Sequence, residues 1–558
     1  MTSLDAPADD IEALASWAVS EGGYRAPEVV FLKNSVSGTS ARSKVAIPQS
    51  SPLLACPISL VIDYDKAASF LFGNSRACPF SKSPTIAIRL FLVSQKLLKS
   101  ESKWAPYIKS LPESFDTPLY YSQKELQLLQ GTNLIGDVEL RKQIWLKEWE
   151  LAIGELPKRF NRDEFTPDLY LWACTVLTSR SFPSNIIFNT ANKESYPVLV
   201  PLVDSLNHYP STPIIWTSAE GKFTLSTGAN VDKGQELFNN YGPKGNEELL
   251  MGYGFCLKDN PFDSVALKIK LPPLSENKKA LINTELENSA FRISPGDLLP
   301  DNLVRLFRVY VVNNFELSKL LVNGIGVPAS IRSELDLSQK LFSALSIKLR
   351  GHKYLTIPNP TKREQDVILY VSHQIEILQA STTAITQRIF LTLNPKSSTD
   401  KLDDIAQLRK AINDNIRLFG FNLRNILTEA IFEEFASVIE QAFGSKDPID
   451  ILDNSLDDQV MVLFICYQYF KPESPWKAWL EAMQTRYNND LELDSDFLED
   501  FEGLHESLVP GLIELEPSIF NEQWTPRQLA WAARVVDSEG VVVEATDGTP
   551  VYWIIAEI

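Results

Sequence analysis

The sequence is poor in the residues that build metal sites and disulfide frameworks. It has five cysteines and four histidines in 558 residues. The cysteines are scattered and odd in number, and no Cys-x-x-Cys or His-x-x-x-His pair occurs. These absences argue against a disulfide-stapled secreted fold, a structural zinc site and a metal-dependent hydrolase. We therefore expect no metal, and a protein of the cytoplasm and also of the nucleus.

Long apolar runs and an excess of basic residues are also missing. No run reaches the length of a membrane span, and the Asp-rich N-terminus lacks a signal pattern. The net charge is −18, so we expect neither a nucleic acid nor a membrane as partner. An acidic enzyme suits a basic protein partner, because opposite charges speed encounter. Solubility alone is the alternative reason for this charge.

Strand and helix signals divide the sequence into two halves. Up to about residue 270, short apolar or β-branched runs alternate with helices, and from about Pro300 long helices follow one another. This pattern predicts an α+β first half and a helical second half that ends in a strand pair, Val541–Glu544 with Val551–Ile555. The predicted long helices are Asp301–Leu321, Ile331–Leu349, Lys362–Phe390, Lys401–Phe419, Asn422–Ala442 and Ser455–Phe470.

Turn-bounded apolar runs predict the strands of the first half. A helix over Phe165–Phe182 interrupts them, with Thr166 as its cap and Pro167 in its first turn. The residues Ser37-Gly38-Thr39-Ser40 read as a loop. The predicted strands are Val29–Leu32, Lys44–Ile47, Leu60–Ile62, Ile214–Thr217, Phe223–Ser226 and Glu236–Asn239.

Two polar clusters lie near the last of these strands. Asn207-His208 offers an amide, an imidazole and backbone groups to a ligand. Tyr241 follows a strand, and its phenol can accept a hydrogen bond from an amine while the ring forms an apolar wall. Taken alone, each cluster has a plainer interpretation as a turn or a core residue. A helix is expected after them, with Asn246 as its cap.

The order of the clusters carries a family resemblance. Asn207-His208, then Tyr241-Gly242, then the run Asn246–Phe255, resembles the two C-terminal motifs of SET-domain protein methyltransferases. The Pro-punctuated stretch Ser102–Pro112 looks like the start of an insertion typical of the plant Rubisco large-subunit methyltransferase subfamily. The resemblance implies a SET-domain β-fold with a helical insertion, followed by an all-α substrate-binding domain.

These domains are assigned by the resemblance. The two parts of the SET domain are residues 1–100 and 165–270, with the helical insertion at 101–164. The helical substrate-recognition domain is 290–510, and a C-terminal helix and strand pair cover 511–558.

The resemblance implies an S-adenosylmethionine-dependent protein-lysine N-methyltransferase that acts on a non-histone protein. Members of the subfamily modify ribosomal proteins, translation elongation factors, cytochrome c or Rubisco, and a relative methylates a histidine of actin. The stretch Phe238–Asn246 looks most like fungal members that act on the translation apparatus. The expected partner is therefore a basic ribosomal protein or elongation factor. Protein-histidine methylation and an inactive protein-binding module are the alternatives.

The resemblance also implies roles for individual residues. Tyr241 is the catalytic residue. The residues that would bind S-adenosyl-L-methionine are Gly38, Thr39, Arg180, Asn207, His208 and Tyr241. The residues that would contact the substrate are Asp204, Tyr253 and Phe255.

Several of these assignments keep alternatives at this stage. Tyr253 and Phe255 could be simple core residues. Arg180 could meet the donor or the substrate, or only satisfy helix-end carbonyls. Asp204 could contact the substrate or cap the turn before Asn207. His208 could be a satisfied structural histidine. The loop at Gly38 has a single glycine where the family has two or more, which puts donor affinity in question or marks an ordinary turn.

Overall fold

The computed structural model describes residues 6–34, 38–190, 194–270, 272–282, 286, 291–393, 419–487, 495–518, 520–521, 523–544 and 550–556. The chain divides into two compact units. Unit 1 comprises Met1–Val265 and Arg350–Glu376, and unit 2 comprises Ala266–Leu349 and Ile377–Ile558. Unit 1 mixes sheets and helices and most of unit 2 is helical, so the predicted α+β class is confirmed.

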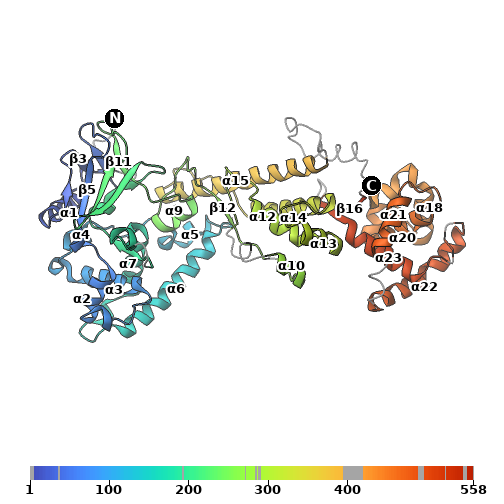
Figure 1. The fold of residues 1–558 in the computed structure, drawn as a ribbon, viewed down its shortest axis with the longest axis horizontal. Helices are drawn as coiled ribbons and strands as arrows, with labels where there is room; N and C mark the ends of the chain where they lie inside the picture. The colour runs from blue at the N-terminus through green and yellow to red at the C-terminus, as the bar shows by residue number, and fades with distance from the viewer. Residues whose placement is uncertain are drawn as a thin grey trace. The chain divides into compact units, whose positions relative to one another are not determined.

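The strands of unit 1 come from both ends of its sequence. They are β1 (Ala6–Pro7), β2 (Tyr24–Arg25), β3 (Val29–Asn34), β4 (Gly38–Ser43), β5 (Pro52–Pro57), β6 (Ser181–Pro183), β7 (Pro197–Leu199), β8 (Asn207–His208), β9 (Ile214–Ala219), β10 (Lys222–Thr227) and β11 (Glu236–Asn239). Their sheets have the orders β1-β3-β4-β11-β8, β2-β5-β10-β9 and β6-β7. β11 pairs antiparallel with β4 and parallel with β8, so strands distant in sequence lie side by side (Figure 1).

The helices of unit 1 share one core with these sheets. They are α1 (Asp9–Ser20), α2 (Tyr64–Phe72), α3 (Pro84–Leu98), α4 (Ala105–Ser110), α5 (Gln123–Gln127), α6 (Leu134–Glu155), α7 (Pro167–Arg180), α8 (Ser184–Ile187) and α9 (Asn246–Tyr253). Phe91 of α3, Tyr170 of α7 and Phe223 of β10 are each at most 1% exposed. Burying such a side chain stabilises the fold by about 1.5–3 kcal/mol.

Helix α7 begins as the sequence predicts. The Thr166 side chain accepts the backbone N–H of Leu169 at 3.3 Å, and Pro167 occupies the first helical position. The helix ends at Arg180, and the chain passes directly into β6. This junction fixes the position of Arg180 at the end of a buried helix.

Three predictions in the first half are wrong. The residues Gly38–Ser40, expected as a loop, open strand β4. The expected strands at Lys44–Ile47 and Leu60–Ile62 are absent as ladders; Ile47 and Ile62 each form only a single bridge, to Val231 and Leu199. The strand in this region is β5. It begins at Pro52 and ends at Pro57, and its apolar run did not predict a strand because proline is disfavoured within sheets.

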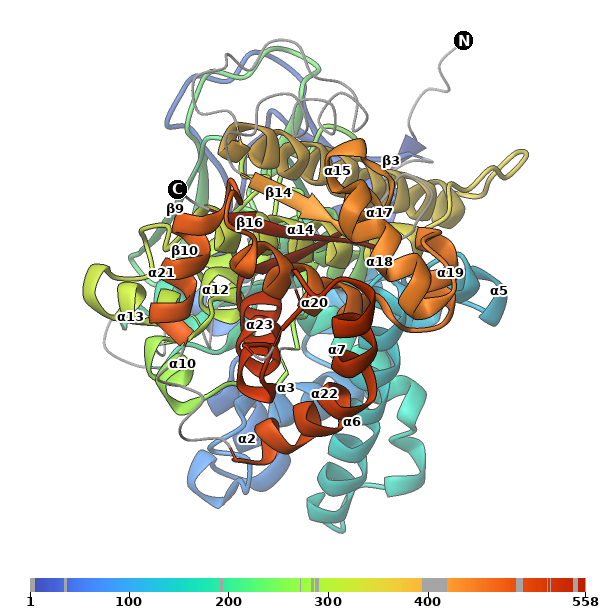
Figure 2. The same cartoon turned by 90° about the vertical axis from the view of Figure 1, so that its right-hand side faces the viewer.

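The chain after residue 264 forms long helices and short strands. These are β12 (Val265–Leu267), α10 (Glu276–Leu281), β13 (Phe291–Ile293), α12 (Asp301–Val311), α13 (Asn314–Asn323), α14 (Ile331–Arg350), α15 (Lys362–Leu393), β14 (Phe419–Asn422), α17 (Leu423–Thr428), α18 (Glu433–Phe443), α19 (Pro448–Asp453), α20 (Asp457–Phe470), α21 (Lys477–Tyr487), α22 (Ser495–Leu515), α23 (Pro526–Glu539), β15 (Gly540–Glu544) and β16 (Pro550–Ala556). In Figure 2, α23 lies among α20, α21 and α22, which pack against it. The predicted terminal strand pair is confirmed as β15 and β16.

Two of the predicted long helices are each divided in the structure. The expected helix Asp301–Leu321 is α12 and α13, because Asn313 and Glu316 form a capping box between them, with both hydrogen bonds at 2.9 Å. The expected helix Asn422–Ala442 is α17 and α18. Most of the expected helix Lys401–Phe419 lies outside the described residues.

Unit 2 buries two arginine–glutamate pairs. Nε and Nη2 of Arg308 lie 2.6 and 3.1 Å from the two carboxylate oxygens of Glu334. Arg332 binds both oxygens of Glu316 in the same forked way. These side chains are at most 6% exposed. The pairing of both oxygens offsets the cost of burying the charges.

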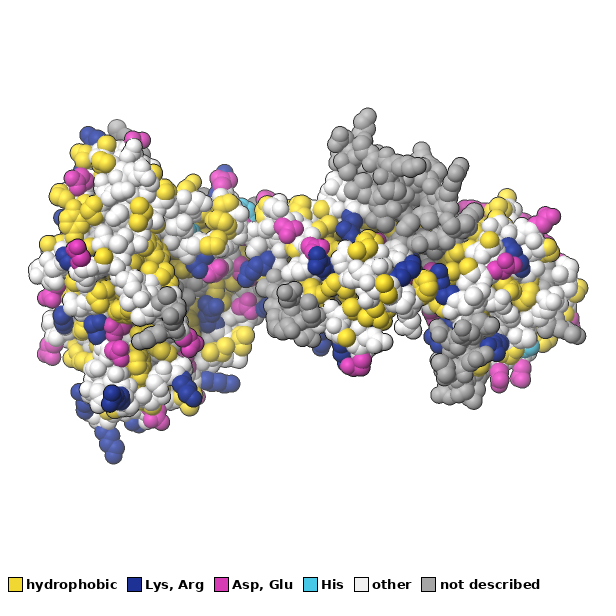
Figure 3. All heavy atoms as spheres, in the orientation of Figure 1, with side chains coloured by type: hydrophobic (Ala, Val, Ile, Leu, Met, Phe, Trp, Pro, Cys, Tyr) yellow, Lys and Arg dark blue, Asp and Glu magenta, His cyan; other side chains and the backbone are white. Residues whose placement is uncertain are grey.

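Three further observations concern the surface and the described residues as a whole. On the face in Figure 3, basic and acidic side chains are interspersed. None of the helices in the described part of the chain combines the length and the apolarity that a membrane span requires. Within the same residues, no three His, Cys, Asp or Glu side chains gather as a metal site would require.

Candidate active site

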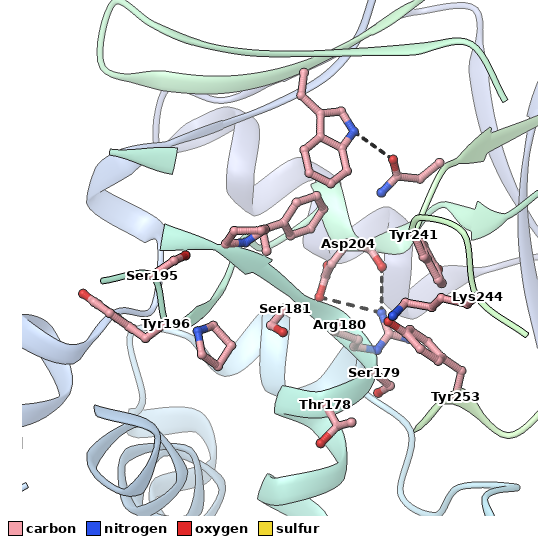
Figure 4. A pocket seen from close by; sticks show the side chains of 15 residues that line it. Thr178, Ser179, Arg180, Ser181, Ser195, Tyr196, Asp204, Tyr241, Lys244 and Tyr253 are labelled. Carbon is pink, nitrogen blue, oxygen red and sulfur yellow. Dashed lines mark hydrogen bonds and ion pairs between the residues drawn. The ribbon is translucent and has the colours of Figure 1, made fainter. Parts of the chain in front are cut away.

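A pocket of about 410 Å³ opens in unit 1 where α7 ends. Arg180, Asp204, Tyr241 and Tyr253 are among its lining residues, and the lining extends to Tyr196 (Figure 4). They come from the end of α7, the turn before β8, the segment after β11 and the end of α9. The pocket therefore forms where separate strand and helix ends meet.

Tyr241 stands at the centre of an aromatic stack. Its ring lies 4.8 Å from that of His208 at 15° and 5.1 Å from that of Tyr253 at 24°. Its hydroxyl donates to the carbonyl of Leu206 at 2.7 Å. Burial raises the pKa of this phenol well above its usual value, so it stays protonated. With its proton engaged, the oxygen keeps its lone pairs for another donor.

His208 is a neutral imidazole fixed by the backbone of Tyr241. Its Nδ1 accepts the Tyr241 N–H at 3.0 Å, so in the neutral ring the proton lies on Nε2. Burial lowers the pKa of this side chain and thus favours the neutral form. Nε2 is buried and has no hydrogen-bond partner within the described residues. A buried donor left in this way marks a place for a ligand acceptor.

Asn207 joins the first part of unit 1 to the motifs that follow residue 200. Its side-chain amide donates to the Thr39 carbonyl and to Glu236 Oε1, both at 2.8 Å. Gly38 precedes Thr39 with φ of +76°, a backbone conformation that favours glycine. The three adjacent strands β4, β11 and β8 therefore bring these residues together.

Asp204 is a buried carboxylate held by two groups. Its Oδ2 accepts the Tyr107 hydroxyl at 2.7 Å and lies 3.8 Å from Nη1 of Arg180. Nη1 of Arg180 also donates to the backbone carbonyl of Asp204 at 3.1 Å (Figure 4). Burial raises the pKa of this carboxyl, while Arg180 and Tyr107 act in the opposite direction. Its Oδ1 is buried and has no partner among the described residues.

Tyr253 and Lys244 form the other wall. The ammonium of Lys244 lies 5.7 Å from the centroid of the Tyr253 ring and forms an ion pair with Glu248. Burial raises the pKa of Tyr253 to about 12. Phe255 contacts Tyr253 edge-on, with centroids 6.3 Å apart, and is not among the pocket-lining residues.

The prediction that Asn246 caps the following helix is wrong. Gly245 is the cap residue of α9, and it makes no side-chain hydrogen bond. Asn246 is fully buried instead; its amide donates to Asp263 Oδ2 at 2.8 Å and lies 3.1 Å from Nδ1 of His373. It also accepts the Leu257 N–H at 3.0 Å. Its side chain thus holds the chain that follows α9 rather than the start of the helix.

Comparisons with known proteins place the chain in a family. No protein-family model matches it. It is 33% identical over 484 residues to the ribosomal lysine N-methyltransferase set10 of Schizosaccharomyces pombe, which covers 82% of this chain and 85% of that protein. The chain belongs to the SET-domain protein-lysine methyltransferases. Within them it is of the Rubisco large-subunit methyltransferase-like type, as the sequence motifs predicted.

Two further likenesses span much of this SET-domain methyltransferase. It is 22% identical to the protein-lysine N-methyltransferase EFM1 of Saccharomyces cerevisiae, over 95% of each chain. The solved structure of the SET domain of LSMT bound to lysine and AdoHcy matches its fold with a TM-score of 0.58 and 22% identity. That match covers 72% of this chain and 95% of the other.

The structure gathers the predicted site residues of this SET-domain methyltransferase into one region. Tyr241, Arg180, Asp204 and Tyr253 line the pocket. The remaining predicted residues lie outside this lining. His208 stacks on Tyr241, and Phe255 contacts Tyr253. Asn207 is hydrogen-bonded to Thr39, which follows Gly38. Their individual roles stay predictions.

Other residues that line the pocket or support its lining were not singled out from the sequence. Tyr107 lies far from the motifs along the chain and is fully buried against Asp204. Trp216, on the surface-facing hairpin, donates its indole N–H to Asn239 Oδ1 at 2.9 Å, and both line the pocket. The Trp-Ala-Pro-Tyr stretch that holds Tyr107 was visible, but nothing local linked it to residue 204.

Proposed function

We propose that this chain transfers a methyl group from S-adenosylmethionine to the ε-amine of a lysine in a ribosomal protein or translation factor. The observation that carries the proposal is the stack of Tyr241 between His208 and Tyr253 beside a buried carboxylate, Asp204. Aromatic walls suit the apolar stem of a lysine, and a carboxylate suits its cationic end.

The residues around Asn207 fit the methyl donor. The buried Nε2 of His208 makes no hydrogen bond to any residue that the structure describes and can donate to a ligand acceptor. No atom of the described residues lies within 4 Å of the point where a Gly38 side chain would begin, so a ligand can approach its backbone from that side. We assign the donor to Gly38, Thr39, Asn207 and His208, with Arg180 at the boundary to the pocket. When bound, S-adenosylmethionine supplies an electrophilic methyl group on a sulfonium.

The chain's own residues prepare the amine. An ammonium has no lone pair, so the lysine must lose a proton before it reacts, and burial in a pocket lowers its pKa. Tyr241 Oη keeps lone pairs that can accept an N–H and aim the amine, because its own proton goes to Leu206. Holding two reactants in line can supply up to about 7–11 kcal/mol of the barrier reduction.

The substrate class follows from the relatives and from charge. One relative is named for ribosomal lysine methylation, and ribosomal proteins are basic. The net charge of −18 favours encounter with such a partner. We propose the helical region 290–510 as its recognition domain and the cytoplasm, with the nucleus, as its place of action. Neither nucleic acid nor membrane is proposed as a partner.

Radiolabelled methyl transfer into ribosomes from a strain lacking this protein tests the function. We expect one or a few labelled lysine-containing protein bands with the wild-type chain and strong loss with Tyr241→Phe. The matched control is Tyr121→Phe, because the Tyr121 hydroxyl is buried without a partner in the described residues and lies outside the pocket lining. Label on histidine, or none in any ribosomal protein, would contradict the proposal.

Calorimetric titration with S-adenosylmethionine separates the enzyme from an inactive binding module. We expect saturable heat with the wild-type chain and also with Tyr241→Phe, since the donor contacts assigned above come mostly from other residues. Absence of heat and of competition at millimolar donor would favour the binding module instead.

A further inference from the structure

The two oxygens of the buried Asp204 carboxylate differ in their contacts with the described residues. The side chain is 1% exposed. Oδ2 accepts the Tyr107 hydroxyl and faces Arg180. Oδ1 has no hydrogen-bond partner among the described residues, although the residue lines the pocket. A buried charged oxygen without a partner is costly, which points to a group that arrives with the substrate.

The other titratable groups of the pocket region are worse placed than a carboxylate to accept the proton of the substrate. Tyr196, in the lining, is a phenol whose pKa is raised to about 12 by burial. Tyr241 and Tyr253 are buried phenols that stay protonated, because burial raises the pKa of both. Arg180 and Lys244 are cations. His208 uses its one accepting nitrogen on the Tyr241 N–H. Among the described lining residues, Asp204 carries the one carboxylate.

We propose that Asp204 Oδ1 accepts the proton that the substrate ammonium loses before methyl transfer, with Tyr107 as a positioning residue that holds the carboxylate through Oδ2. This inference rests on the proposed function. The N–H bond breaks, the proton moves to Oδ1, and the electron pair remains on nitrogen. That pair forms the N–C bond, and the electrons of the broken C–S bond leave with sulfur. Asp204 afterwards releases its proton to solvent.

The surroundings of Asp204 suit a proton acceptor. Burial disfavours its ionised form, whereas Arg180 from α7 and Tyr107 from α4 favour it. Burial, and in turn this carboxylate, raise the pKa of the neighbouring Tyr241 phenol and of the Cys56 thiol in β5, so both keep their protons. Burial raises the pKa of this carboxyl, and burial lowers that of an entering amine. Both shifts reduce the difference between the pKa of the amine, which gives up the proton, and the pKa of the carboxyl, which accepts it.

The pH dependence of kcat tests the assignment, with ribosomes from the deletion strain as substrate. In the wild-type chain, kcat should rise with pH through the ionisation of Asp204. In Asp204→Asn we expect a loss of about 10²–10⁴-fold near neutral pH. The remaining rate should climb about tenfold per pH unit, because solvent must then supply the free amine. The kcat of Asp204→Asn should therefore approach that of the wild-type chain at high pH.

Tyr107→Phe separates positioning from packing. It removes a hydrogen bond that favours the carboxylate, so the rise of kcat should move to higher pH by about one unit, with near wild-type rates above it. Tyr121→Phe should leave the profile unchanged. Calorimetric binding of S-adenosylmethionine should be unaltered in all three variants, which shows that they are folded.

Three results would overturn the assignment. A higher KM in Asp204→Asn with an unchanged kcat profile would make Asp204 a binding contact only. A uniform loss of rate at every pH in Tyr107→Phe would make Tyr107 merely structural. If the wild-type chain labels no ribosomal protein, the proposed function fails, and the proton-acceptor role fails with it.

Discussion

Two buried ion pairs of unit 2 and two buried side chains of unit 1 differ in how their polar atoms are bonded. In unit 2, Arg308 and Glu334 meet through two hydrogen bonds, as do Arg332 and Glu316, and these pairs tie helices together. In unit 1, Asp204 and His208 each bury a polar atom that finds no partner in the described residues. Forked pairing between helices indicates a structural role, whereas an unused buried donor or acceptor beside the pocket, as at Asp204 and His208, indicates a place for a ligand.

The largest effect on stability is expected from breaking a pair in unit 2. Glu334→Gln leaves the buried guanidinium of Arg308 without its carboxylate and also removes the partner of Arg388. The free energy of unfolding should fall by about 3–5 kcal/mol, measured by chemical denaturation. The control is Glu433→Gln, whose exposed ion pair with Lys446 should contribute far less to the free energy of unfolding, because water screens it. Equal losses would erase the contrast between buried and surface pairs.

In unit 1, Tyr241→Phe should reduce the activity strongly and the stability only slightly. It deletes the hydroxyl that meets the Leu206 carbonyl, so stability should fall by only about 1 kcal/mol. Methyl transfer should fall by about 10²–10³-fold, the usual cost of one preorganised polar group at a reacting centre. Radiolabel incorporation and thermal unfolding of the same preparation give both numbers. A variant that is much less stable than the wild-type chain but keeps its specific activity would contradict the assignment.

A matched pair of helix caps compares the units directly. Thr166 and Thr525 each accept a backbone N–H at 3.3 Å, and a proline follows each. Thr166→Ala and Thr525→Ala should each cost about 1 kcal/mol, read by chemical denaturation of each variant. If only one of the two substitutions lowered the free energy of unfolding, the threonine cap would not stabilise both units alike.

The smallest effect is expected at His373, which lies on the part of α15 that belongs to unit 1. Its Nδ1 is 3.0 Å from Asp263 Oδ2, and that hydrogen bond raises the pKa of the imidazole. The stabilisation is therefore complete below about pH 6.5, the unfolded value, and is lost as pH rises through the folded pKa. His373→Gln should remove this slope from a plot of unfolding free energy against pH. A wild-type slope of the opposite sign would contradict the assignment.

The sequence predicted best what depends on local chemistry. The cap at Thr166, the hairpin of β9 and β10 and strand β11 follow from residues that are neighbours in the chain. The motifs also placed His208 beside Tyr241, as their stacked rings confirm. Those motifs work because the strand ends that carry them are brought together by the parallel pairing of β8 with β11.

What escaped prediction depends on distant contacts. Nothing near Tyr107 announces that its hydroxyl meets Asp204, since only the packed core brings the two together. Asn246 has the local signature of a helix cap, yet Asp263 and Leu257 compete for its side chain from further along the chain. The break at Asn313 was hidden because apolar periodicity runs on through it.

The chain leaves unit 1 at Val265 and comes back to it for Arg350–Glu376 before departing again. In that returning stretch, Arg363 pairs with Asp116, and the Tyr370 hydroxyl bonds to Glu247 at 2.7 Å. A chain truncated after Val265 would therefore lose the ion pair of Asp116 and the hydrogen bond of Glu247, both of which stabilise unit 1. A minimal version of unit 1 must therefore include those 27 residues. During synthesis, unit 1 cannot fold completely until the ribosome has passed residue 376.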